Sequence, residues 1–201
     1  MMKSTKAMAI ALAVGLGFNG LANAEERAWA WSPLGIGIAA PIQLPFIESD
    51  VYGIRFGGFF GYNHDVYGID CGVSGYCSGG FRGLQVGAFD WTEGNVYGLQ
   101  VGAVANVVGG RSYAAQFGLA NVVWADAYGA QFGVVNYDAD FTGVQVGGVV
   151  NWNLNASYGL EISLVNANQD EFMGFFLGGL VNYSEKFTGF ALAPVNVSYE
   201  M

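Results

Sequence analysis

Few side chains in this sequence have the types and the spacing that catalysis or metal binding requires. His64 is the single histidine, and it follows Asn63 in a polar stretch with no second histidine or cysteine placed beside it. General acid–base chemistry needs partners that orient the imidazole and tune its pKa. We therefore interpret His64 as a surface turn residue, and we expect no enzyme activity and no catalytic, cofactor-binding or metal-binding residues.

Acidic residues recur in the polar stretches between apolar segments. They are Asp65, Asp90, Glu93, Asp126, Asp138, Asp140, Asp170, Glu171 and Glu185. Asp138 with Asp140 could offer oxygens to Ca²⁺, as could Asp170 with Glu171. The spacing, however, matches neither the EF-hand loop nor the nine-residue calcium-binding coil, and no pair stands out as the two carboxylates of a glycosidase. We interpret these acids as solvated turn residues that oppose aggregation.

Glycine and aromatic residues are the other abundant types. The chain has 32 glycines among 201 residues, but no glycine-rich loop is followed by Lys-Ser or Lys-Thr, which excludes a phosphate-binding loop. One aromatic residue recurs in each of several units, as Tyr97, Tyr113, Tyr128, Phe141 and Tyr158. Such rings could form a binding stripe for a sugar or a polymer, or pack against one another. Their recurrence once per unit favours packing.

Two cysteines, Cys71 and Cys77, lie six residues apart. In a straight strand they would be about 20 Å apart, which is beyond the reach of a disulfide. A bend at Gly72-Val73-Ser74-Gly75 would let them meet. Whether they are bridged stays open at this point.

The elements that carry all these residues form an internal repeat. A glycine that follows an aromatic residue by one or two places returns every 14 to 16 residues. This anchor column consists of Gly53, Gly68, Gly83, Gly98, Gly129, Gly143, Gly159, Gly174 and Gly189, with Ala114 in the same place. The chain is thus an array of about ten units of roughly fifteen residues.

Other columns repeat with the anchor glycine. Three places after it stands an apolar residue or cysteine, from Phe56 to Leu192, and the next place is usually a second glycine. A glutamine column occupies positions between 85 and 145, and an asparagine column positions between 106 and 196. This alternation has the period of a strand. Some units carry one extra residue between Gln and Asn, which predicts a corner or a bulge at the second glycine.

An all-β repeat array fits two architectures, and we favour a β-solenoid. Each unit would be one coil, stacked about 4.8 Å from the next, so that identical residues lie above one another. Stacked Asn side chains would then hydrogen-bond along the array, at roughly 1 kcal/mol for each bond. The apolar column would form a continuous core.

The alternative is an antiparallel outer-membrane-type β-barrel with one strand per unit. Aromatic residues at both strand ends, an apolar face and a span of about eleven residues suit a tilted strand in a bilayer. Antiparallel neighbours, however, would give identical columns no reason to stack. The connections are also uniformly short, whereas such barrels have long outer loops.

The N-terminal residues have the pattern of a secretory signal peptide. Two lysines are followed by an apolar run over residues 7–21 and by the cleavage site Ala22-Asn23-Ala24, which predicts a signal peptide at 1–24. Residues 25–50 form an N-terminal lead-in or cap, and residues 51–201 form the β-repeat domain. No later apolar run reaches eighteen residues, so no spanning helix is expected.

The charge balance limits the possible partners. Cleavage removes two of the seven basic residues and leaves five against 16 acidic ones, a net charge of −11. Such a surface repels phosphate backbones and anionic lipid headgroups, so nucleic acid is excluded as a partner.

The unit resembles the repeat of a family of bacterial surface-repeat proteins, which reads Gly-Leu-Gln-Ile/Val-Gly-Leu-Val-Asn. The matching segments are Gly83-Leu84-Gln85-Val86-Gly87, Gly98-Leu99-Gln100-Val101-Gly102, Gly143-Val144-Gln145-Val146-Gly147 with Val149-Val150-Asn151, and the final Ala193-Pro194-Val195-Asn196-Val197-Ser198-Tyr199. The similarity covers about residues 52–199, but Arg55 and Asp70 replace Gln in the first two units. The resemblance implies export and a place at the cell envelope, and it transfers no catalytic residue.

These observations predict an exported, non-enzymatic cell-envelope protein whose array serves as a scaffold or a binding surface. The expected location is the cell surface or the outer membrane, with the periplasm as the alternative. The alternative function is an integral outer-membrane barrel, for example a small pore, which would associate with the membrane through its strands. The envelope or extracellular partner, the ligand and the oligomeric state are not encoded in any recognisable motif.

Overall fold

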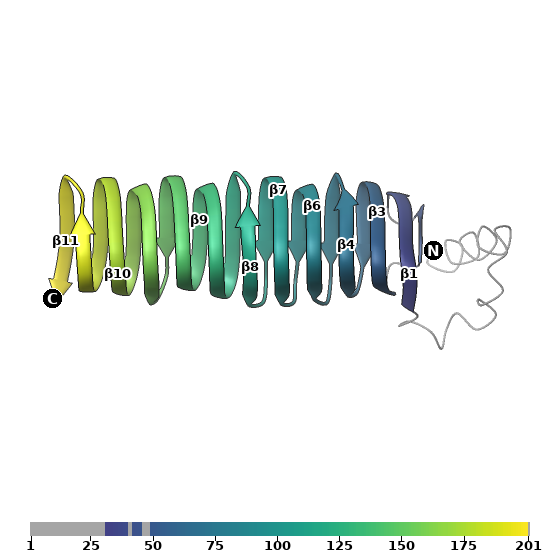
Figure 1. Cartoon of the computed structure of the whole chain (residues 1–201), viewed down its shortest axis with the longest axis horizontal. Helices are drawn as coiled ribbons and strands as arrows, with labels where there is room; N and C mark the ends of the chain where they lie inside the picture. Colours follow the sequence, from purple (N-terminus) through teal and green to yellow (C-terminus); the bar gives the residue numbers. More distant parts are fainter. Residues whose placement is uncertain (1–30, 40–41, 46–48, 201) are drawn as a thin grey trace, which may run out of the picture.

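The computed structural model describes residues 31–39, 42–45 and 49–200. The predicted signal peptide lies outside the described residues, as do the first residues of the N-terminal segment. Within the described part the chain is 87% strand without a helix, and it winds as a β-solenoid of about 11 turns (Figure 1). The strands are β1 (Trp31–Ala39), β2 (Ile42–Leu44), β3 (Asp50–Asn63), β4 (Val66–Gly72), β5 (Ser74–Cys77), β6 (Phe81–Thr92), β7 (Val96–Val108), β8 (Ser112–Phe117), β9 (Ala120–Asn153), β10 (Ser157–Leu192) and β11 (Val195–Glu200).

Successive coils stack in parallel and in register. Gly53 pairs with Gly68, and two coils further on Gly83 pairs with Gly98 and Gln85 with Gln100. The same holds from β3 to β11, so each column of the sequence becomes a row along the axis of the solenoid. The solenoid prediction is confirmed. The barrel alternative is wrong, because its neighbouring strands would have to run antiparallel.

The N-terminal segment contributes one more layer to the stack. β1 pairs in parallel with β3, from Trp31 opposite Asp50 to Ala39 opposite Phe60. β2 then turns back and pairs antiparallel with β1. The parallel stacking therefore begins before residue 51, and a short antiparallel strand lies outside it.

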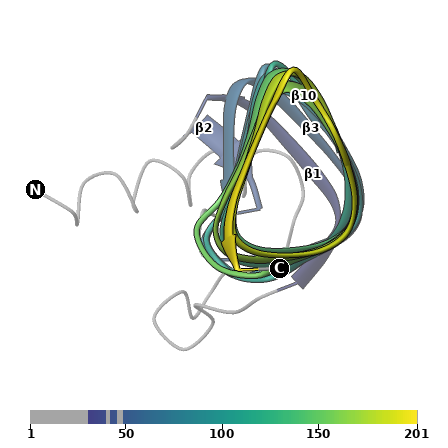
Figure 2. The ribbon, with the colours of Figure 1, turned by 90° about the vertical axis from the view of Figure 1, so that its left-hand side faces the viewer.

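Viewed along its axis, the solenoid has a rounded, three-sided cross-section in which the coils superimpose (Figure 2). The nine anchor glycines have φ between 130° and 150°, a region that other residues rarely adopt. An added Cβ on most of them would lie 1.9–2.4 Å from the carbonyl oxygen of the anchor residue one coil earlier. Glycine recurs in this column because two backbones approach closely there.

The second glycine of each unit marks an irregularity, as predicted. The pairing of β6 with β7 shifts register between Gly87 and Phe89. The pairing of β9 with β10 shifts between Ile162 and Val165. Units with an extra residue absorb it there, so the Gln and Asn columns both stay in register.

Replacing Gly143 with Ala should destabilise the array by about 2 kcal/mol or more. Its φ is 141°, and a Cβ would lie 1.9 Å from the Gly129 oxygen. The matched control is Ala114→Gly in the same column, where the native residue is not at positive φ. It should change stability by less than about 1 kcal/mol. Urea unfolding followed by circular dichroism measures both variants, and equal midpoints for the two would contradict the close-approach explanation.

Candidate functional site

The glutamine column forms a hydrogen-bonded ladder inside the solenoid. Its members are Gln85, Gln100, Gln116, Gln131 and Gln145, all buried. Each Nε2 donates to the Oε1 of the preceding coil at 2.8–2.9 Å. The side chain of Gln85, the first member, donates to Asp70 Oδ2 at 2.9 Å. The amides can be buried because each is satisfied by its own copy in the next coil.

The asparagine column forms a second ladder, which confirms the predicted stacking. Its members are Asn106, Asn121, Asn136, Asn151, Asn166, Asn182 and Asn196. Each Nδ2 donates to the Oδ1 of the following coil at 2.8–2.9 Å. The two ladders therefore run in opposite directions along the axis.

The first two units, which carry Arg55 and Asp70 in the glutamine column, hold a buried ion pair instead. Arg55 Nε donates to Asp70 Oδ1 at 2.7 Å and its Nη2 donates to Oδ2, and both side chains are almost fully buried. The guanidinium also donates to Asn63 Oδ1 at 3.3 Å and to the Tyr76 carbonyl at 3.1 Å. The Asp70 carboxylate therefore ends the glutamine ladder, and Arg55 neutralises the charge of that carboxylate.

Three further carboxyl groups are buried: Asp90, Asp138 and Glu161. The interpretation of Asp90 and Asp138 as solvated turn acids is wrong, because the strand alternation turns both of them inward. Glu161 was not predicted as a buried acid, although it occupies the glutamine column between Leu160 and Ile162. Its place in the same column as the glutamines would have identified it.

Burial raises the pKa of all three carboxyl groups. The pKa of Asp138 lies well above 3.8, although hydrogen bonds from Gln131 and Gln145 oppose the shift. The pKa of Glu161 is raised to about 7 by burial, against hydrogen bonds from Ser157 and Asn residues. For Asp90, burial and the Asp70 charge raise the pKa to about 8. The interior thus contains two carboxyl groups, Asp90 and Glu161, that titrate near neutral pH.

The apolar column faces outward, so the expectation of a continuous apolar core at this column is wrong. Phe56 and Val86 are 50% and 38% exposed, whereas the neighbouring Gln85 is fully buried. Adjacent columns of a strand face opposite sides, so burying glutamine turns the apolar residues to the surface. The buried apolar residues come instead from the column two places before the anchor glycine, as at Val51 and Phe81.

We call the two outward columns that lie one and three places after the anchor glycine the apolar wall. They begin at Ile54 and Phe56 and end at Phe190 and Leu192. Every residue in them is apolar or cysteine, and each is exposed or half-buried. A stable monomer rarely exposes so long a continuous apolar surface, which indicates a contact surface.

Outward charges collect at the corner where one coil ends and the next begins, which we call the acidic ridge. It consists of Asp50, Asp65, Glu93, Arg111, Asp126, Asp140, Asp170, Glu171, Glu185, Lys186 and Glu200. Nine acids stand against two bases, and Arg111 pairs with Asp126 at 2.9 Å. Among residues 49–200, Arg82 is the one outward charge that lies off this ridge.

The recurring tyrosines stack on one another beside the wall. Ring centroids lie 5.0 Å apart for Tyr97 and Tyr113, and 4.9 Å apart for Tyr113 and Tyr128. The rings thus cover one another's faces and present their edges to solvent. Sugar stacking needs an exposed ring face, which these rings do not offer. The rings pack against one another, as predicted from their recurrence once per unit. Phe141 lies outside the row, because it is buried in the column beside it.

The two cysteines are both free thiols. Cys71 lies in the apolar wall and is half-buried, whereas Cys77 is fully buried on the inside. Burial raises the pKa of the Cys77 thiol to about 12, against the nearby Arg55 guanidinium, which lowers it. The sequence did not decide whether Cys71 and Cys77 form a disulfide. The structure places the two side chains on opposite sides of the coil.

Native protein should therefore take up one alkylating group per chain, at Cys71. Cys77 should react only after unfolding, because its thiol is inaccessible and not ionised. Intact mass after iodoacetamide treatment, with and without guanidinium, measures the count, and Cys71→Ser should show no native labelling. Equal labelling of both cysteines in native protein would contradict this placement.

His64 lies at the acidic ridge and is half-buried, with Nδ1 3.3 Å from the Ser78 hydroxyl. It is close to two acids: one ligand atom from each of Asp50, His64 and Asp65 lies within 4.8 Å of the others. Asp138 and Asp140, which are set aside above as calcium ligands, have different surroundings. Asp138 is buried in the glutamine ladder, whereas Asp140 accepts bonds from the next coil at the ridge.

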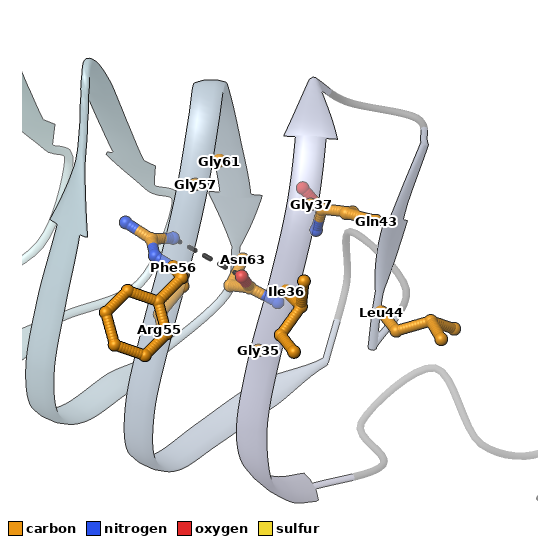
Figure 3. A pocket seen from close by; sticks show the side chains of 10 residues that line it. All are labelled: Gly35, Ile36, Gly37, Gln43, Leu44, Arg55, Phe56, Gly57, Gly61 and Asn63. Atoms are coloured by element: carbon orange, nitrogen blue, oxygen red, sulfur yellow. Dashed lines mark hydrogen bonds between the residues drawn. The ribbon is translucent and has the colours of Figure 1, made fainter.

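A small hollow lies at the N-terminal end of the solenoid, between β1, β2 and β3 (Figure 3). It is lined by glycines together with Gln43, Arg55 and Asn63, and has about 10 Å³ of space, roughly that of one water molecule. The guanidinium of Arg55 points toward Asn63 there (Figure 3). The hollow is too small for a substrate.

The stacked, in-register coils and their internal ladders define the class of this protein as a parallel β-solenoid with a polar interior and an apolar outer wall. Comparisons with protein-family models, curated proteins and solved structures found no match to the chain. No helix capable of crossing a bilayer occurs in the part of the chain that the structure describes.

Proposed function

We propose that this protein is an exported, non-enzymatic scaffold of the cell envelope that docks onto a neutral lipid surface through its apolar wall. The carrying observation is the separation of surface types on one rigid array. The wall holds no charged residue from Ile54 to Leu192, whereas the outward charges gather on the acidic ridge. The predicted signal peptide and the resemblance to surface-repeat proteins support export and an envelope location, with the periplasm as the alternative.

The charge of the ridge selects the kind of lipid. Nine acidic side chains would repel an anionic bilayer and favour zwitterionic headgroups. Apolar wall residues would gain roughly 25 cal/mol for each Å² that they remove from water. Binding therefore grows with the number of coils that touch the surface at once, without any one strong contact.

The interior supports a structural role over a catalytic one. Two of its carboxyl groups are tied into the polar network, and Asp138 accepts hydrogen bonds from Gln131 and Gln145. Glu161 likewise accepts a hydrogen bond from Asn153 at 2.9 Å. A catalytic acid needs an open position for a substrate. Beside these buried carboxyl groups, that space is filled by side chains of neighbouring coils.

Vesicle flotation tests this function. The mature chain should float with phosphatidylcholine vesicles, and anionic lipid should weaken that binding. Phe117→Ser with Phe132→Ser replaces two exposed rings of the wall, whose centroids are 4.9 Å apart, and should weaken binding several-fold. The matched control Asp140→Asn changes the ridge and should not weaken it.

Circular dichroism is the folding control, and both variants should retain the native spectrum. A mature chain that stays monodisperse in buffer and does not bind phosphatidylcholine at any lipid concentration would refute the proposed docking. Sequencing of the N-terminus of exported protein tests the predicted start at Glu25.

A further inference from the structure

The acidic ridge contains one place where three ligand-type side chains converge. Asp50 begins β3, and Asp65 precedes β4 exactly one coil later in the stack, with His64 beside it. The Asp65 amide donates to Asp50 Oδ1 at 3.2 Å, which holds the two acids together. Ligand atoms of the three residues all lie within 4.8 Å of one another.

The stacking of one acid on another needs a compensating charge. Asp50 and Asp65 are both half-buried, so water screens their two charges only in part. Arg55, the buried cation on the same strand as Asp50, is engaged by Asp70. A bound divalent cation would neutralise the carboxylate pair.

The following coil packs its backbone against this place but brings no side chain from its two glycines. It provides Gly79 and Gly80, and a Cβ on Gly79 would lie 2.1 Å from Asp65 Oδ1. The amide of Gly80 donates to that same oxygen, and the Tyr67 hydroxyl donates to Asp65 Oδ2 at 3.3 Å. These contacts orient the Asp65 carboxylate while a side chain on the third coil is sterically excluded.

We infer that Asp50, His64 and Asp65 form a binding site for a divalent transition-metal ion of the zinc type. An imidazole nitrogen with two carboxylates is a donor set for such ions, whereas Ca²⁺ and Mg²⁺ prefer oxygen ligands alone. Three protein ligands leave one position for water. The contact of His64 with the Ser78 hydroxyl fixes the orientation of the ring, as metal-binding histidines require.

The geometry needs only a small adjustment to bind the ion. Bonds of about 2.1 Å in a tetrahedron place ligand atoms roughly 3.4 Å apart, so rotation of the side chains must shorten the present separations. The ion would then join the start of β3 to the start of β4. This inference does not depend on the proposed docking function.

Calorimetric titration of Zn²⁺ into the mature chain tests the site. The chain should carry no histidine tag and should have Cys71→Ser, so that no other strong ligand is exposed. We expect one Zn²⁺ per chain, and a higher unfolding temperature when it is bound. His64→Ala and Asp50→Asn should each weaken binding at least tenfold.

Asp140→Asn is the matched control, because Asp140 has the same place in its repeat as Asp50 and Asp65 but no adjacent histidine. It should leave the affinity unchanged. The inference is overturned if Zn²⁺ does not bind, if His64→Ala binds it as well as the parent chain, or if Asp140→Asn weakens binding equally. Displacement of Zn²⁺ by a hundredfold excess of Ca²⁺ would overturn the assignment to a transition metal. Unfolding without metal shows whether each variant is folded.

Discussion

Replacing Arg55 with Gln should destabilise the solenoid by about 3–5 kcal/mol, the usual cost of leaving one member of a buried ion pair without its partner. Both side chains are almost fully buried, and Arg55 satisfies both oxygens of Asp70. With the guanidinium removed, the carboxylate keeps only the Gln85 amide as a partner. Chemical unfolding monitored by circular dichroism measures the loss.

A second substitution makes this prediction specific. Changing Asp70 to Gln in the Arg55→Gln chain extends the native glutamine ladder by two coils, because Gln occupies this column in the next five. The double variant should recover most of the lost stability, which a double-mutant cycle reports as a strong coupling between the two positions. A double variant that is less stable than both single variants would show that the two positions require charge.

Replacing Asp90 with Asn should stabilise the protein at neutral and alkaline pH and reduce its dependence on pH. Asp90 lies opposite Asn106, where the asparagine ladder begins. Both Asp90 oxygens and Asn106 Oδ1 are buried without a hydrogen-bond partner. An Asn at this place supplies an Nδ2 that donates to Asn106 Oδ1, as every later member of the ladder donates to the next.

The sign of the pH effect follows from the two pKa values. The folded chain keeps a proton on Asp90 up to about pH 8, whereas an unfolded chain loses it near 3.8. Between these values the folded state binds more protons, so the stability of the native protein falls as pH rises, by about 1.4 kcal/mol per pH unit for this group. The Asp70 charge adds to the shift and the Arg55 charge opposes it.

Asp90→Asn should therefore gain on the order of 3 kcal/mol over the native chain at pH 7, and the part of this gain that depends on pH should vanish below about pH 4. Unfolding free energies measured from pH 4 to pH 9 give the difference. Asp126→Asn, on the exposed ridge, is the control and should leave the slope unchanged. A constant difference between Asp90→Asn and the native chain at all pH values would contradict a buried, protonated Asp90.

The repeat made much of this fold predictable. The one-unit period of the asparagine column indicated parallel stacking, since only a copy in the next coil gives each amide a partner. The extra residue between Gln and Asn located the irregularity at the second glycine. The parallel stacking and the position of the irregularity both follow from residue spacing, which can be read directly from a sequence.

The facing of the columns could not be predicted in the same way. Alternation shows that Gln85 and Val86 face opposite sides, but it does not say which side is the interior. The usual preference for apolar interiors gave the wrong answer, because it does not account for amides that pair with copies of themselves at the coil spacing. Asp90 and Asp138 were misplaced for the same reason.

The candidate metal residues were missed because His64 was compared only with its sequence neighbours. Asp50 and Asp65 are fifteen residues apart, which is one coil. Applying the period to the charged residues, as it was applied to the glycines, would have placed one acid on the other beside His64. In a solenoid, residues one period apart are nearest neighbours.

The ladders also govern how such a chain can change length. Removing the coil that carries Gln100 would leave the Gln85 Oε1 to accept from Gln116, and the Asn ladder would close in the same way. Duplicating that coil would equally leave every donor with an acceptor. We therefore expect insertions and deletions of whole units in this region to be tolerated, whereas the coils of Arg55 and Asp70 must be gained or lost together. Coils could thus be added or removed after the Arg55–Asp70 pair, and the side chains of the two ladders would still find hydrogen-bond partners.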